Sequence, residues 1–107
     1  MFRAVRTRNV GLMQDILTRF HGNIDTIQDF RGNTLISLAT INGDHNMIKL
    51  LIKKGNVDPN SRNLEGNTPL HIAVARGDTR CIDMLIGNKC DEMVQNNDGK
   101  TPWEMCR

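Results

Sequence analysis

The stretch that decides the fold runs from Gly66 to Ala73 and reads Gly-Asn-Thr-Pro-Leu-His-Ile-Ala. Gly66 lies where the chain must turn sharply, and glycine tolerates a positive φ at such a position. Thr68 is suited to cap a helix with its hydroxyl, and Pro69 suits the first helical position. The stretch therefore predicts a tight turn that leads directly into a helix.

The same pattern recurs on either side of this stretch. Segments 29–36 and 96–103 align with 63–70, and the aligned glycines Gly32, Gly66 and Gly99 are 34 and 33 residues apart. A self-similar period of this length is typical of a stacked repeat architecture. Each repeat cannot bury its own apolar face and depends on its neighbours for stability.

A Gly-Asp pair divides each of the two fullest repeats, at 43–44 and again at 77–78. The glycine is expected to end a first helix in a left-handed conformation, and the aspartate to cap a second helix. In the second helix of the earlier repeat, apolar residues recur in a stripe at helical spacing. We expect His45, Lys49 and Lys53 to lie on the opposite, solvated side of that helix.

The segment Thr68-Pro69-Leu70-His71-Ile72-Ala73 closely resembles the signature of the ankyrin-repeat family, whose period is 33 residues. The resemblance covers nearly the whole chain. It implies an all-α solenoid of stacked helix-turn-helix units joined by β-hairpin-like turns. It also implies one domain over 1–107, which consists of a partial first repeat 1–28, a second repeat 29–62, a third repeat 63–95 and a partial fourth repeat 96–107.

Some positions depart from the family pattern. Leu35 and Ser37 replace the usual proline and histidine, so we expect a looser turn before that helix. His71, which is part of the motif, is expected to bond locally and fix its turn. The fourth copy stops within its first helix, which favours a fragment of a longer protein and leaves an apolar end near Trp103 that could associate with another copy.

Composition and motif content argue against several other functions. The net charge is +2 without a dense basic stripe, which disfavours nucleic-acid binding. There is no apolar run long enough to span a membrane, and three cysteines without paired spacing favour reduced thiols in the cytoplasm or nucleus. The three histidines are far apart and no phosphate-binding loop or zinc-ligand spacing is present. We therefore expect no enzyme activity, no metal and no cofactor.

The resemblance implies binding of a partner protein through the tips of the turns and the exposed side of the first helices. Mapped onto this sequence, the candidate contacts are Phe30, Arg31, Asn33, Ile41, Asn42, Leu64, Glu65, Asn67, Ala75, Arg76, Asn97 and Lys100. Phe30 and Leu64 occupy equivalent positions on adjacent repeats. They either form an apolar binding patch rimmed by arginine or only pack on each other to support the turns.

The primary functional hypothesis is therefore a protein-interaction module. Two alternatives remain open at this point: a recruiting domain of a larger enzyme, such as a ubiquitin-ligase component or an acyltransferase, or an ankyrin regulator that inhibits a kinase or a transcription factor. No residue in the chain names the partner.

Overall fold

The computed structural model describes residues 6–7, 9–19, 28–54 and 57–105, and all structural statements below concern these residues. The elements in chain order are helices α2 (Val10–Arg19), α3 (Leu35–Asn42), α4 (His45–Lys54), α5 (Pro69–Arg76) and α6 (Thr79–Gly87), then the short 3₁₀ helix η2 (Pro102–Met105). The described part of the chain is helical without strands, which confirms the predicted all-α repeat architecture.

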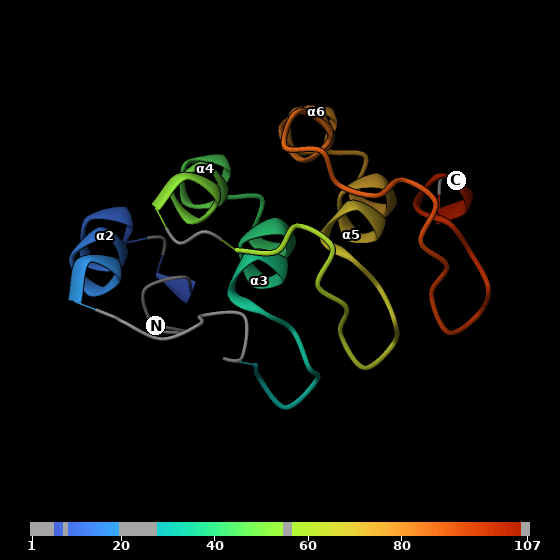
Figure 1. The fold of residues 1–107 in the computed structure, drawn as a ribbon, viewed down its shortest axis with the longest axis horizontal. Helices are drawn as coiled ribbons and strands as arrows, with labels where there is room; N and C mark the ends of the chain where they lie inside the picture. Colours follow the sequence, from blue (N-terminus) through green and yellow to red (C-terminus); the bar gives the residue numbers. More distant parts are fainter. Residues whose placement is uncertain (1–5, 8, 20–27, 55–56, 106–107) are drawn as a thin grey trace.

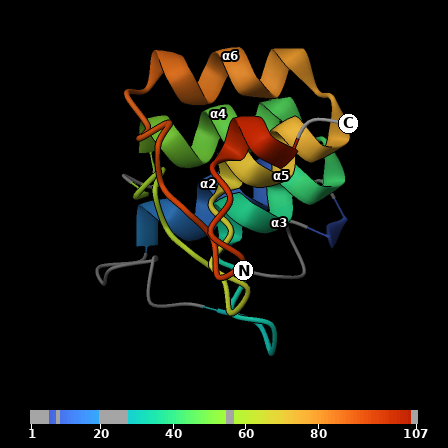
Figure 2. The ribbon, with the colours of Figure 1, turned by 90° about the vertical axis from the view of Figure 1, so that its right-hand side faces the viewer.

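The helices form two rows (Figure 1). The second helices α2, α4 and α6 lie in one row, and α3, α5 and η2 lie in the other, while the loops that precede α3, α5 and η2 project away from both rows. A view from the side shows the helices running across the molecule, roughly at right angles to these loops (Figure 2). The helices α3, α5 and η2 pack side by side, as do α2, α4 and α6.

Helix α5 begins as its sequence predicts. Thr68 is the N-cap and Pro69 the first helical residue, and the Thr68 hydroxyl accepts a hydrogen bond from the backbone N–H of His71. The His71 side chain accepts in return from the backbone N–H of Thr68, which completes a reciprocal capping box. The predicted local role of His71 is thereby confirmed.

The predicted helix ends are also confirmed. Gly43 and Gly77 close α3 and α5 in the left-handed region, with φ of 66° and 68°. The carboxylates of Asp44 and Asp78 then accept from backbone N–H groups in the first turns of α4 and α6, at 3.2 Å in both cases.

The turn before α3 lacks the hydrogen bond that caps α5. Thr34 makes no side-chain bond to the backbone of its helix, in line with the predicted effect of Leu35 and Ser37. Its hydroxyl instead bonds the Ser37 hydroxyl at 3.2 Å and the Ser61 hydroxyl at 2.9 Å. Side-chain hydroxyls thus replace the histidine in holding this turn.

The core is one continuous cluster that runs through the stack. It is built from aliphatic, methionine and cysteine side chains, with no aromatic residue among its buried described members: Met13, Leu35, Ile36, Ala39, Met47, Ile48, Leu51, Val57, Leu70, Ala73, Val74, Cys81, Leu85 and Cys90. The small residues Ala39 on α3 and Ala73 on α5 are fully buried. The predicted burial of Cys81 is confirmed, whereas Cys106 lies outside the described residues.

Candidate functional site

The surface predicted to bind a partner is built on three loops, which we call tip loop 1 (29–33), tip loop 2 (63–67) and tip loop 3 (96–100). In tip loop 1 the Asp29 side chain accepts from the backbone N–H groups of Arg31 and Asn33, both at 2.9 Å. Asn63 and Asn96 make the same pair of bonds in the other two loops. Three different stretches of sequence therefore form one loop geometry.

The fourth residue of every tip loop is a glycine whose φ lies between 76° and 78°. The two inner glycines also sit against the next loop. A Cβ added to Gly66 would lie 2.7 Å from the backbone nitrogen of Asn97, and one added to Gly32 would lie 2.9 Å from that of Leu64. Both the backbone conformation and the contact between loops thus require glycine at these positions.

Backbone hydrogen bonds join the tip loops to one another. The N–H of Leu64 donates to the carbonyl of Arg31, and the N–H of Asn97 donates to the carbonyl of Glu65, each at 3.0 Å. The Asn97 side chain adds a bond to the carbonyl of Leu64 at 2.7 Å. The backbones of the three tip loops are consequently held at fixed positions relative to one another.

Two of the predicted contact residues serve the loops instead of the surface. Asn33 is only 5% exposed, and its side-chain oxygen accepts from the Asn63 amide at 3.0 Å. Asn67 is half-buried and accepts from the Asn96 amide at 2.9 Å. The expectation that Asn33 lies on an exposed tip is wrong, because its amide is needed to connect two loops.

Phe30 and Leu64 project from the second positions of tip loops 1 and 2. Phe30 is 82% exposed and Leu64 is 70% exposed. The Arg31 guanidinium lies 5.5 Å from the centre of the Phe30 ring, at cation–π distance. Exposure this high means that neither apolar side chain is buried by the other, so mutual packing does not account for them.

The remaining predicted contacts fall into two groups. Glu65, Asn97 and Lys100 are exposed on tip loops 2 and 3. The other group is at the far ends of the first helices, where Ile41, Ala75 and Arg76 are exposed and Asn42 is half-buried. Because α3 rises about 1.5 Å per residue, its last turn lies roughly 10 Å along the axis from its start at tip loop 1. The structure therefore divides the predicted surface into a tip part and a helix-end part.

The helix-end part is coupled to the next repeat. A Cβ added to Gly43 would lie only 3.1 Å from a guanidinium nitrogen of Arg76 in the following repeat. Partial burial of Asp78 favours its neutral form, but the bonds from His45 and from the N–H of Cys81, with Arg76 nearby, hold the pKa of Asp78 below its ordinary value.

His45 corrects a second sequence expectation. It was placed on the solvated side of α4, yet its Nε2 lies 2.9 Å from both carboxylate oxygens of Asp78 on the following helix pair. The two side chains are mostly shielded from solvent. This pair is a contact between repeats that the sequence reading missed, although the two residues are separated by about one period of the repeat.

The described residues contain no group of three or more His, Cys, Asp or Glu side chains arranged to hold a metal ion. Burial raises the pKa of the Cys81 thiol to about 11, and that of Cys90 also lies above its ordinary value for the same main reason. No helix in this part of the chain combines the length and apolar character needed to cross a bilayer.

A stack of helix pairs with rigidly linked, surface-exposed tip loops defines a repeat scaffold that presents side chains for binding. The family profile described as "Ankyrin repeats (3 copies)" matches residues 1–98. The chain therefore belongs to the ankyrin-repeat family, and the resemblance seen in its sequence is confirmed.

Individual proteins similar to this chain are much longer than it is. The target of rapamycin complex 2 subunit AVO2 of Saccharomyces cerevisiae is 33% identical over 86 residues, which are 80% of this chain and 20% of that protein. The E3 ubiquitin-protein ligase KEG of Arabidopsis thaliana is 31% identical over 75% of this chain and 5% of its own length. The mouse protein phosphatase 1 regulatory subunit 12A is 32% identical over 78% of this chain and 8% of its own length.

Proposed function

We propose that this chain binds a partner protein through its tip loops, with Phe30 and Leu64 as the apolar centre of the contact. The observation that carries the proposal is their exposure, 82% and 70%, on two loops that a backbone hydrogen bond joins. Large exposed apolar side chains held in place by a rigid backbone lose little entropy on binding and bury much apolar area. Arg31 and Glu65 supply a charged rim beside them.

The helix-end residues Ile41, Ala75 and Arg76 form the second part of the proposed contact. A partner that reaches from the tip loops to these residues would run along the row formed by α3, α5 and η2. Family membership supports a protein partner in general terms, because ankyrin repeats are interaction modules.

Two settings suit such a module. Among the relatives, one is an E3 ubiquitin-protein ligase and another a phosphatase regulatory subunit. A domain that recruits substrates to an enzyme, or one that regulates an enzyme by binding it, is accordingly the alternative to a free-standing interaction module. We place the activity in the cytoplasm or nucleus, which is compatible with the unpaired thiols of Cys81 and Cys90.

Photo-crosslinking tests the proposal. A benzoylphenylalanine introduced at Phe30 or Leu64 is expected to capture one or a few defined proteins in the source cell, and Phe30→Ser/Leu64→Ser is expected to lose them in affinity capture. Met93 offers the matched control, because it is 71% exposed but lies outside the tip loops. If the same proteins are captured from position 93, or if the double variant retains them, the tip loops are not the binding surface.

A further inference from the structure

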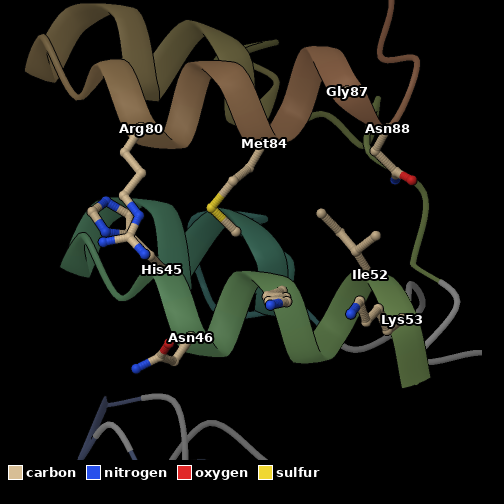
Figure 3. A pocket seen from close by; sticks show the side chains of 9 residues that line it. His45, Asn46, Ile52, Lys53, Arg80, Met84, Gly87 and Asn88 are labelled. Carbon is tan, nitrogen blue, oxygen red and sulfur yellow. The ribbon is translucent and has the colours of Figure 1, made fainter.

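A second surface lies on the row formed by α2, α4 and α6, away from the tip loops. A groove of about 380 Å³ runs between α4 and α6 and is lined by His45, Asn46, Lys49, Ile52, Lys53, Arg80, Met84, Gly87 and Asn88. Figure 3 shows Met84 from α6 and Ile52 from α4 pointing into the space between the helices, which gives the groove an apolar floor. Neither the tip loops nor the helix ends of the proposed contact take part in it.

The charge of this groove is of one sign. Among the residues that the structure describes, its lining includes Lys49, Lys53 and Arg80 but no aspartate or glutamate. Across the described ranges, none of these three cations forms a salt bridge. Asp78, the nearest acid in the sequence to Arg80 on its N-terminal side, is occupied by His45. The three cations at the groove therefore have no ion-pair partner among the described residues and are available to an acidic group that binds there.

The groove continues on the other side of α4. A hollow of about 350 Å³ between α2 and α4 is lined by Val10 and Leu50 and shares Asn46, Lys49 and Lys53 with the first groove. Lys49 and Lys53 therefore line two neighbouring hollows, each of which also has apolar side chains in its lining. Their aliphatic stems can cover apolar groups of a ligand while their ammonium groups meet its charges.

From this arrangement the geometry points to a docking groove for an acidic segment of a partner protein, in which carboxylates flank one or two aliphatic side chains. The carboxylates would pair with Lys49, Lys53 and Arg80, and the aliphatic side chains would contact Met84 and Ile52. Charge complementarity of this kind speeds association and orients the ligand. A nucleic acid suits the groove less well, because the described lining offers no aromatic side chain for base stacking.

The experiment is a selection of random 12-residue peptides displayed on phage against the full chain at low salt. We expect the selected peptides to be rich in Asp and Glu interspersed with Leu, Ile or Met. Their affinities are then measured by fluorescence polarisation with synthetic labelled copies. Because exposed ion pairs are individually weak, Lys49→Gln/Lys53→Gln/Arg80→Gln is expected to weaken binding by about tenfold. A Met84→Ser variant with an unchanged helical content should also weaken it.

The controls locate the effect. Arg6→Gln/Lys89→Asn removes exposed positive charge outside the groove and should leave the affinity within about twofold of the parent chain. Peptides that lack acidic residues, or no enriched peptides at all, would overturn the inference. So would equal affinity for the triple variant, loss of binding only in Phe30→Ser/Leu64→Ser, or preferential retention of a labelled single-stranded DNA 20-mer. Loss of binding only in Phe30→Ser/Leu64→Ser would overturn the inference about the groove but would leave the proposed function standing. The two proposals therefore fail separately.

Discussion

Replacing His71 by alanine tests whether the stack is held by bonds between its repeats. The imidazole is completely buried. Its Nε2 lies 2.8 Å from the carbonyl of Lys100 in tip loop 3, and its Nδ1 lies 3.1 Å from the backbone nitrogen of Thr68. Because Nδ1 accepts from an N–H group, Nε2 carries the proton and donates to Lys100. One ring thus joins the start of α5 to a loop almost one repeat further along the chain.

The magnitude follows from what each group loses. Without the imidazole, the buried N–H of Thr68 has no acceptor, which costs about 1–3 kcal/mol. The carbonyl of Lys100 still accepts from the N–H of Asn96 at 2.9 Å, so its loss is only about 1 kcal/mol. The lost packing of the ring adds to this, and the free energy of unfolding should fall by about 3 kcal/mol.

Ser37 provides the matched control, because it occupies the corresponding position in the first turn of α3 and is also completely buried. In Ser37→Ala the hydroxyl of Thr34 loses one partner but keeps its 2.9 Å bond to Ser61. We expect this variant to lose about 1 kcal/mol at most.

Urea unfolding at pH 7 measures both variants. With an m value of about 1.5 kcal/mol/M, the loss in His71→Ala lowers the midpoint by about 2 M. The sole tryptophan, Trp103, lies on η2 next to the released loop, so its fluorescence should change at lower urea than the far-UV circular dichroism of the helices. A midpoint no lower than that of Ser37→Ala would refute the reasoning.

Three further predictions follow from the loops and the thiols. Gly66→Ala should destabilise the chain by clearly more than Gly99→Ala. Both glycines have φ near 78°, which strains an alanine by about 1–2 kcal/mol, but of the two only the Cβ at position 66 meets a neighbouring loop. Equal urea midpoints for the two variants would contradict this prediction. Asp78→Asn should cost about 1 kcal/mol at neutral pH. Because the folded pKa of Asp78 lies below 3.8, this deficit is present above that pH and should shrink as the pH falls through the folded pKa, whereas a deficit that stays constant between pH 7 and pH 2.5 would exclude the link. In a Cys106→Ser background at pH 8, Cys81 should resist iodoacetamide until urea unfolds the chain, because its pKa is about 11. Peptide mass spectrometry separates Cys81 from Cys90, and rapid labelling of Cys81 in the native protein would show that it is not buried.

The parts of the fold that depend on neighbouring residues in the chain could be predicted from the sequence. Thr68 and Pro69 start α5, and Gly77 and Asp78 end it and begin α6, because capping and left-handed glycines are local chemistry. The place of Phe30 on a tip loop was predicted on the same basis, whereas its exposure was one of two alternatives that the sequence left open.

The parts that were missed lie between repeats. The bond from Asn63 to Asn33 spans 30 residues, and the bond from His45 to Asp78 spans 33. A single repeat read alone shows an exposed amide and an exposed histidine at these positions. Aligning the sequence with itself after a shift of 34 residues places Asp78 next to the counterpart of His45, since a solenoid brings each residue near its counterpart in the following repeat. The same shift leaves Asn63 four residues away from the counterpart of Asn33, so that bond depends on how the two loops pack.

The tip loops show how this scaffold separates folding from recognition. The first residue of each loop binds its backbone, the fourth is glycine, and in tip loops 1 and 2 the fifth is an asparagine that accepts from the next loop. The second and third residues have no such duty in tip loop 1, so Phe30 and Arg31 are free to be chosen for a partner. In tip loop 3 the second residue, Asn97, already bonds the carbonyl of Leu64. The apolar patch of Phe30 and Leu64 therefore ends at tip loop 2.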